Sequence, residues 1–169
     1  IKDLLSMSAG FEVDDWTAVR RTSNLINEFF DLEFKHEPGT HYKYSTETSH
    51  VLSLIITRKT GLKLNEFLEK NVFNILGIKN YKWTLTPEGL TYGGSGLFIS
   101  HNDLIKLGKL LINNGIYNGQ RVVSKTYLDL ATSQQVIKKA NINNPLAKAI
   151  GCGYGYQFHI TNENEYRSE

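Results

Sequence analysis

The histidines and the cysteine of this chain do not have the spacing of a metal site. No two of the five histidines stand four residues apart, as zinc ligands on one helix face do; they are His36, His41, His50, His101 and His159. His36-Glu37 is followed by Pro38, which does not continue the helix that a zinc-protease motif needs. Cys152 has no second cysteine with which to share a zinc ion or a disulfide. We therefore expect no metal and no cofactor, and interpret His50, His101 and Cys152 as packing or surface residues.

The segment Gly93-Gly94-Ser95-Gly96 is similar to two catalytic motifs without matching either. A phosphate-binding loop would need a lysine that is missing here. A nucleophile elbow would need a second glycine where Leu97 stands. We interpret the segment as a structural turn.

Lys59-Thr60-Gly61 has the letters of one motif of the penicillin-recognising serine enzymes. That motif needs an extended backbone at a sheet edge. Leu52, Ile55 and Ile56 precede these residues at helical spacing. We therefore predict that the three residues end a helix, with Gly61 as its left-handed cap.

The segment Tyr44-Ser45-Thr46 stands where an extended stretch meets the start of a helix. A tyrosine hydroxyl has a reference pKa of about 10, so it can act as a general base only where a positive charge or a helix N-terminus favours the phenolate. The unpaired amides in the first turn of the next helix supply part of that field. The alternative is a structural tyrosine whose ring packs beside Tyr42 while its hydroxyl meets solvent.

Helices with clear ends are predicted over most of the chain. The apolar spacing and the capping residues place them at 3–8, 14–30, 46–60, 64–76, 100–112 and 124–131. Ser45 or Thr46, Ser100 and Ser124 are the expected N-caps of three of them. Gly77 stands just beyond the end of the helix 64–76. The stretch 134–150 has little periodicity and is expected to be a surface loop.

The residues 154–160 alternate between apolar and polar and predict one half-buried strand. A lone strand does not satisfy its own backbone groups, so it needs neighbours. The chain offers only 97–99 and the stretch near Tyr42 as candidates. We therefore expect most of this strand's sheet to lie outside the 169 residues.

The composition is that of one globular domain or most of one. The chain has 169 residues, of which 40% are hydrophobic, and a formal charge of +2. Its longest apolar runs are far shorter than the roughly 20 residues that span a bilayer. Single lysines stand between apolar positions, as on solvated helix faces, which disfavours nucleic-acid binding; they include Lys63, Lys70, Lys79, Lys106, Lys109 and Lys138. The first residue is Ile1 and no leader follows it, so we expect a piece of a longer protein.

Several segments together resemble the beta-lactamase family of serine hydrolases related to the class C enzymes. Residues 1–10 resemble the family's T-I-R-H-L-L-T-H-T-S-G segment, and residues 38–45 its P-G-x-x-x-x-Y-S segment. Three further pieces follow in the family's order and spacing; they lie at 61–68, 72–78 and 93–104. The resemblance covers nearly the whole chain.

The resemblance implies roles for three residues. Tyr44 corresponds to the catalytic tyrosine that takes a proton from the serine nucleophile and returns it to the leaving group. Thr46 stands where the family commonly has Asn and, with Ser95, would contact the substrate; a hydroxyl has fewer donors than an amide. Tyr81, Trp83 and Tyr92 would line the same cleft, with a core role as the alternative for Trp83.

The resemblance also implies the fold and the reaction. We expect an α+β class, mainly α here, with a helical domain at 1–150 and the incomplete start of an adjoining antiparallel sheet at 151–169. No serine has a lysine three positions later, so the family's Ser-x-x-Lys motif is absent, as is its third motif. The intact parent would hydrolyse amide, beta-lactam or ester carbonyls through an acyl-enzyme, and this chain alone would be inactive.

Two other functions stay open at this point. The parent could be a non-catalytic cell-wall-binding or sensory module of the same fold, or the chain could be an unrelated helical interaction domain. The expected partner is a small-molecule or peptide substrate, with no nucleic acid and no membrane contact from this segment. Family resemblance favours an extracytoplasmic parent.

Overall fold

A computed structural model describes residues 1–11, 25–137, 153–160 and 166–167. The chain divides into two compact units, Ile1–Thr48 with Asp129–Glu169, and Ser49–Leu128. The boundary predicted at residue 150 lies outside the described residues. The mixture of helices and small antiparallel sheets confirms the predicted α+β class.

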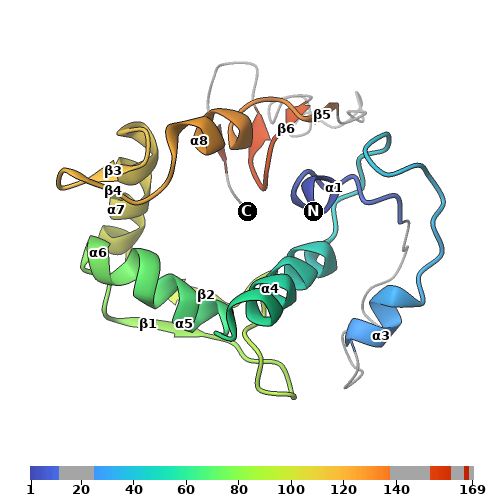
Figure 1. Cartoon of the computed structure of the whole chain (residues 1–169), viewed down its shortest axis with the longest axis horizontal. Helices are drawn as coiled ribbons and strands as arrows, with labels where there is room; N and C mark the ends of the chain where they lie inside the picture. The colour runs from blue at the N-terminus through green and yellow to red at the C-terminus, as the bar shows by residue number, and fades with distance from the viewer. Residues whose placement is uncertain (12–24, 138–152, 161–165, 168–169) are drawn as a thin grey trace. The chain divides into compact units, whose positions relative to one another are not determined.

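The first unit combines helices with one four-stranded antiparallel sheet (Figure 1). Its helices are α1 (Lys2–Leu5), α3 (Leu25–Phe30), the first turn of α4 (Thr46–Thr60) and the end of α8 (Lys125–Ala131). The strands pair in the order β5-β6-β7-β8; they are Val136–Ile137, Gly153–Tyr154, His159–Ile160 and Tyr166–Arg167. The predicted helix 3–8 is shorter than expected, since Met7 has a φ of 55° and leaves the helical conformation. Of the predicted helix 14–30, residues 14–24 lie outside the described part.

The prediction of one strand over 154–160 was wrong, because these residues form a hairpin. β6 and β7 pair antiparallel, with Tyr154 opposite His159. Between them Gln157 has a φ of 63°, and the Gly155 amide donates to the Phe158 carbonyl at 2.8 Å. A side chain at Gly155 would collide with the Ala131 carbonyl, so the chain turns where the alternation suggested that it continues.

Two further predictions about strands were wrong. Leu97–Ile99 does not pair with the last strand but forms β2, antiparallel to β1 (Tyr81–Trp83). The expected loop 134–150 begins with β5, and its residues from 138 onward lie outside the described part. The sheet thus has four strands from this chain, each too short to show an alternation. That most of the sheet lies outside the 169 residues stays a prediction.

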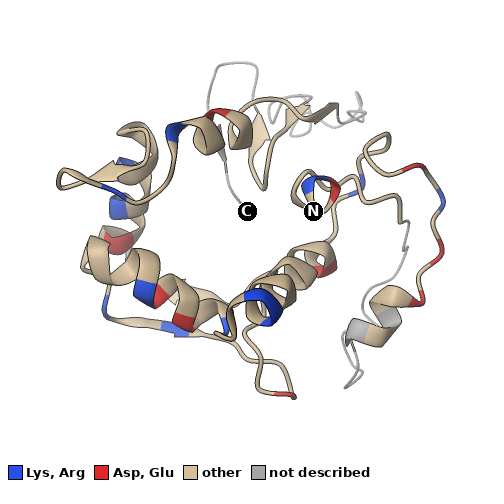
Figure 2. Cartoon of the chain, viewed as in Figure 1, with Lys and Arg blue, Asp and Glu red and all other residues tan. Residues whose placement is uncertain are grey.

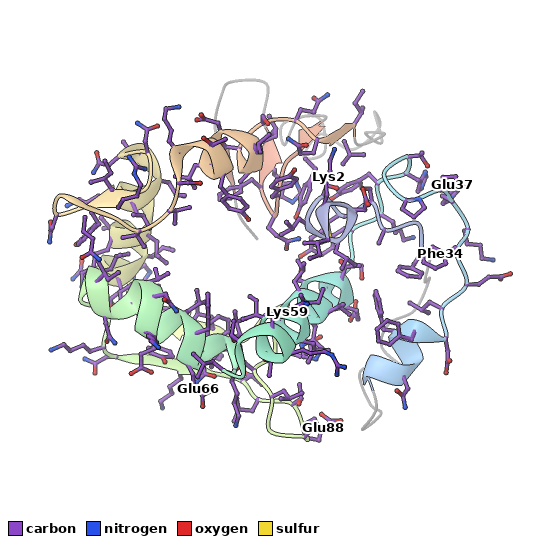
Figure 3. The ribbon with its side chains drawn as sticks, viewed as in Figure 1. Lys2, Phe34, Glu37, Lys59, Glu66 and Glu88 are labelled. Atoms are coloured by element: carbon purple, nitrogen blue, oxygen red, sulfur yellow. The ribbon has the colours of Figure 1, made fainter. Side chains whose placement is uncertain are left out.

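Apolar side chains from distant parts of the sequence form the core of the first unit. Met7, Val136 and Tyr154 are buried together, and Tyr42 packs against them. The Tyr42 and Tyr154 rings have centroids 5.2 Å apart. Outside this core, the ring of the exposed Phe34 (Figure 3) lies tilted against Phe11 with centroids 4.4 Å apart.

The second unit holds the longer helices around its own core. Residues Leu64–Leu76 are helical throughout, as predicted, but the middle is a π-helical turn; the pieces are α5 (Leu64–Leu68), η1 (Glu69–Phe73) and α6 (Asn74–Leu76). They pack on α7 (His101–Ile112), and the short hairpin of β3 (Ile116–Tyr117) and β4 (Gln120–Arg121) follows α7. The buried core consists of Phe73, Leu76, Ile78 and Leu110.

The predicted helix ends are confirmed at four places. Ser100 accepts from the Asp103 amide at 3.1 Å and caps α7, and Ser124 accepts from the Tyr127 amide at 3.2 Å at the start of α8. Gly77 is left-handed with a φ of 66°. Lys59 (Figure 3) lies in the last turn of α4, and Gly61 after it has a φ of 72°. The Lys-Thr-Gly letters therefore form a helix end, not a sheet-edge motif.

Basic residues are spread along the described elements, with Arg58 and Lys59 adjacent in the last turn of α4 (Figure 2). Lys70, Lys79 and Lys109 are exposed, and Lys106 is half-buried. Lys106 bonds the Gly77 carbonyl at 2.9 Å and the Asp103 carboxylate at 2.7 Å. These lysines behave as solvated or locally paired charges, in line with the prediction from their spacing.

Candidate active site

The start of α4 is a capped helix N-terminus, as the sequence predicted. The Ser45 hydroxyl accepts a hydrogen bond from the Thr48 amide at 3.2 Å, and its side chain is buried. Tyr44 directly precedes this cap, and Thr46 directly follows it as the first residue of α4. The helix start thus sets the positions of both predicted site residues.

The backbone on both sides of Tyr44 is bonded to Met7. The Lys43 amide donates to the Met7 carbonyl at 2.8 Å, and the Ser45 amide donates to the Met7 sulfur at 3.4 Å. The side chain of Tyr44 is 39% exposed. The ring is therefore not sealed in the interior, although its backbone is held.

Met7 has its position because the segment 1–10 folds back on the residues before α4. The Ser6 and Ser8 hydroxyls are 2.8 Å apart, and the Gly39 amide donates to the Ser8 carbonyl at 2.8 Å. Met7 is 1% exposed and packs in the core of the first unit. Two of the segments that resemble the family, 1–10 and 38–45, thus pack against each other.

Glu47 is a buried carboxylate in the first turn of α4 that the sequence reasoning did not single out. It is 4% exposed and accepts from the Ser45 hydroxyl at 3.4 Å. A carboxylate is favoured at a helix N-terminus because the first amides carry partial positive charge. An acidic residue two positions after a capping serine was the signal that could have identified it.

The turn 93–96, which carries Ser95, lies against α4 within the second unit. The Gly93 amide donates to Nδ1 of His50 at 3.2 Å, and the Ser53 hydroxyl donates to the Thr91 carbonyl at 3.2 Å. A Cβ at Gly93 would lie 2.6 Å from Cβ of Ser53, so this close approach requires glycine. The interpretation as a structural turn is confirmed, and Ser95 itself is exposed.

His50 is a buried packing residue, as predicted. Its side chain is 4% exposed, and its ring stacks on Tyr92 with centroids 4.9 Å apart. Burial lowers the pKa of His50, and the charge of Glu88 opposes part of this shift. Because Nδ1 accepts from Gly93, the neutral ring carries its proton on Nε2. His101 is exposed, and Cys152 lies outside the described residues.

Trp83 joins the core of the second unit and also bonds to the turn. Its ring packs against the buried cluster around Phe73, and its Nε1 donates to the carbonyls of Tyr92 at 2.9 Å and of Ser95 at 3.2 Å. The core role left open for Trp83 is confirmed. That Trp83, Tyr81 and Tyr92 also line a cleft stays a prediction.

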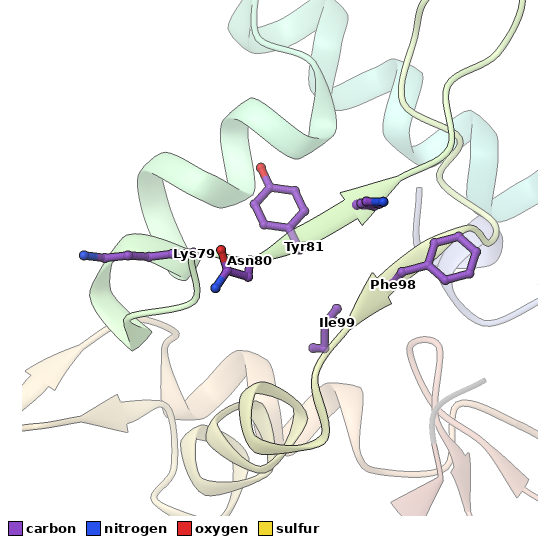
Figure 4. Close-up of a pocket in the computed structure, with 6 residues that line it drawn as sticks. Lys79, Asn80, Tyr81, Phe98 and Ile99 are labelled. Atoms are coloured by element: carbon purple, nitrogen blue, oxygen red, sulfur yellow. The ribbon is translucent and has the colours of Figure 1, made fainter.

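A shallow depression of about 430 Å³ lies beside β1 and β2 (Figure 4). Its lining residues are Lys79, Asn80, Tyr81, Lys82, Phe98 and Ile99. Tyr81 donates to the Glu69 carboxylate at 2.9 Å, and burial together with that carboxylate raises the pKa of Tyr81. Tyr81 is thus held as a neutral donor. The depression contains Tyr81, which was predicted to line the cleft, but not Tyr44, Thr46 or Ser95.

The predicted site residues belong to two different units. Tyr44 and Thr46 flank the cap residue Ser45 in the first unit, whereas Ser95 belongs to the second. The roles assigned to the three stay predictions. Among the described residues no cluster of three metal-ligating side chains occurs, and no described helix could span a membrane.

A family model for beta-lactamase matches residues 1–167. The chain belongs to the beta-lactamase family. The resemblance to this family that the sequence suggested is thereby confirmed. Members of the family are hydrolases of the amidase and esterase kind.

Similar proteins add detail to the family match. The 6-aminohexanoate-dimer hydrolase of Paenarthrobacter ureafaciens is 26% identical over 102 residues, which are 59% of this chain and 26% of that protein. The solved structure of a candidate beta-lactamase from Bacteroides dorei has a TM-score of 0.72 at 18% identity and covers 94% of this chain and 51% of its own. The structure of a candidate 6-aminohexanoate-dimer hydrolase from Bacillus anthracis also has a TM-score of 0.72 at 18% identity. The match covers 99% of this chain and 49% of that protein. The chain thus spans about half the length of these beta-lactamase-fold structures, and they show that it has their fold.

Proposed function

We propose that this chain is part of a serine hydrolase that cleaves amide, beta-lactam or ester carbonyls through an acyl-enzyme, with Tyr44 as the general acid and base. The observation that carries the proposal is the setting of Tyr44. Tyr44 is 39% exposed as a residue, its backbone is held on both sides, and it directly precedes the capped N-terminus of α4. A general base needs an accessible oxygen at a defined position, next to groups that stabilise its charge.

The proposed reaction has two steps. A serine oxygen attacks the carbonyl carbon, and its proton passes to the Tyr44 oxygen; the phenol then protonates the departing amine or alcohol. Water next attacks the acyl ester, gives its proton to the Tyr44 oxygen, and the serine leaves with that proton. The serine and its lysine would come from a Ser-x-x-Lys motif, which this sequence does not contain. The chain alone is accordingly expected to have no turnover.

The substrate class extends beyond beta-lactams in this proposal. The relative from Paenarthrobacter ureafaciens is named for hydrolysis of a 6-aminohexanoate dimer. This name is the reason to include a linear amide among the substrates to be tested. Thr46 and Ser95 are the proposed substrate contacts, through their hydroxyls. Thr46 has fewer donors than an amide side chain, which favours substrates that need one donor at this position.

The test measures the hydrolysis rate of the full protein encoded by the gene that contains this sequence. Its coding sequence is first read for Ser-x-x-Lys, and hydrolysis of nitrocefin, a p-nitrophenyl ester and the 6-aminohexanoate dimer is then measured. We expect Tyr44→Phe to lower kcat by about 10²–10⁴-fold on the substrate that is cleaved, with little change in KM. Activity that survives Tyr44→Phe would refute the role of Tyr44.

Two controls separate this result from its alternatives. Tyr127 is 44% exposed, so Tyr127→Phe removes a hydroxyl from a tyrosine of similar exposure and should leave kcat unchanged. If the coding sequence has no Ser-x-x-Lys and no substrate is cleaved, the proposal fails in favour of a non-catalytic cell-wall-binding or sensory module. The isolated chain should also not be labelled by a fluorescent penicillin.

A further inference from the structure

The residues at the start of α4 provide only half of a capping box. Met7, which is distant in the sequence, provides the other half. In a capping box the N-cap hydroxyl accepts from the third helical amide, and a Glu or Gln at that third position accepts from the N-cap amide. Ser45 and the Thr48 amide form the first half. The second half has no Glu or Gln, because the third helical residue is Thr48.

The side chain of Thr48 does not supply the missing acceptor. Its hydroxyl donates to the Ser45 carbonyl at 2.6 Å, and a second, longer contact of 3.2 Å joins it to the Met7 sulfur. The Ser45 amide instead donates to the Met7 sulfur at 3.4 Å, across 38 residues of sequence. The thioether thus takes the place of the Glu or Gln side chain.

Met7 also holds the other side of Tyr44. The Lys43 amide donates to the Met7 carbonyl at 2.8 Å, so one residue fixes the amides before and after Tyr44. Met7 can do this because its backbone is left-handed, with a φ of 55°, and its side chain is buried among Tyr42, Val136 and Tyr154. A left-handed methionine is strained, and such strain persists only where the surroundings hold it.

We propose that Met7 is a positioning residue for Tyr44, which it holds through its carbonyl on one side and its sulfur on the other. This inference rests on the proposed function of Tyr44. Loss of the sulfur leaves the backbone acceptor in place but frees the Ser45 amide. The phenol then changes its position relative to the first amides of α4, on which its ionisation depends.

The single methionine of the sequence makes an atom-level test possible. Norleucine has a CH₂ group in place of the sulfur, and selenomethionine keeps a similar acceptor, so biosynthetic replacement changes one atom of this sequence, apart from any initiator methionine. The first measurement is amide hydrogen exchange by NMR. We expect the Ser45 amide to exchange about fivefold faster with norleucine and unchanged with selenomethionine.

The reference amide for exchange is that of Ile78, which donates to the Phe73 carbonyl at 2.8 Å in the second unit. Its exchange rate should not change. A rise of equal size at Ser45 and Ile78 would mean general destabilisation and would overturn the proposal. Met7→Leu, made by ordinary mutagenesis, should reproduce the norleucine result.

The second measurement follows the phenol itself. The pH titration of the ring carbon that bears the Tyr44 hydroxyl, assigned with Tyr44→Phe, should have a different midpoint in the norleucine protein. Tyr127, of similar exposure, is the control and should titrate unchanged. An unchanged Ser45 exchange rate, or an unmoved Tyr44 midpoint, would overturn the positioning role. Neither readout needs turnover, so a failure here is distinct from a failure of the kinetic test.

Discussion

At the scale of single residues, this part of the beta-lactamase family fold uses buried residues to hold backbone segments next to predicted site residues. Met7 binds the amides on both sides of Tyr44, and His50 binds the Gly93 amide two residues before Ser95. Both supporting side chains are buried. Their contributions can therefore be measured as stability before any substrate is known.

The burial of His50 and its hydrogen bond from the Gly93 amide predict that the chain is less stable in mild acid than at neutral pH. Because the pKa of His50 is lowered in the folded chain, the unfolded chain takes up the proton first as the pH drops below the reference value of about 6.5. The free energy of unfolding should thus fall between pH 7.5 and 5.5. A protonated Nδ1 would also lose its hydrogen bond from Gly93.

Urea unfolding at these two pH values checks this prediction. His50→Asn keeps an acceptor near Nδ1 but does not titrate, so its stability should depend less on pH than that of the wild type. His101→Asn alters an exposed histidine and should keep the wild-type dependence. Equal pH dependence in wild type and His50→Asn would contradict the role of His50.

At the scale of elements, the helices are delimited by caps that join one element to the next. Ser100 caps α7, and its hydroxyl also donates to the Asp103 carboxylate at 2.8 Å. The Lys106 ammonium and the Ser100 hydroxyl lower the pKa of Asp103, so this contribution to stability is fully present above the reference pKa and is lost below it, as the pH falls through the lowered pKa of the folded chain. Lys106 also bonds the Gly77 carbonyl after α6, which joins the end of α6 to the start of α7.

Removal of this cap should weaken the second unit by a measurable amount. We expect Ser100→Ala to lower the free energy of unfolding by about 1 kcal/mol at neutral pH, because the Asp103 amide loses its acceptor. Ser100→Thr keeps the hydroxyl and should lose less. Urea denaturation of the three proteins measures the difference, and equal midpoints for alanine and wild type would show that the cap does not stabilise α7.

At the scale of the whole molecule, the first unit depends on contacts between the two ends of the chain. The Gln157 side chain donates to the Leu5 carbonyl at 3.0 Å across 152 residues, and Tyr154 is buried with Met7. The predicted catalytic segment therefore rests on a core to which residues after 150 contribute. A substitution in the β6–β7 hairpin should therefore change the hydrogen exchange rate of the Lys43 amide.

Tyr154→Ala is expected to lower the free energy of unfolding by about 3–5 kcal/mol, since it leaves a cavity beside Met7. Hydrogen exchange of the Lys43 amide, which is bonded to the Met7 carbonyl, should become faster. Tyr127→Ala, at an exposed position, should change stability by less than about 0.5 kcal/mol. If Lys43 kept its protection in Tyr154→Ala, the hairpin would not support the segment that carries Tyr44.

The sequence by itself determined the family, the class of fold, and most helix ends, because these depend on local information: apolar spacing, capping serines and glycines with positive φ. Ser45, Gly61, Gly77 and Ser100 all have the roles that their neighbours predicted. Tertiary structure alone decided the hairpin at Gly155, the pairing of β2 with β1, and the bonds from Met7 to the amides around Tyr44. These features depend on which distant backbone groups lie within hydrogen-bond reach, and no local spacing of residue types contains that information.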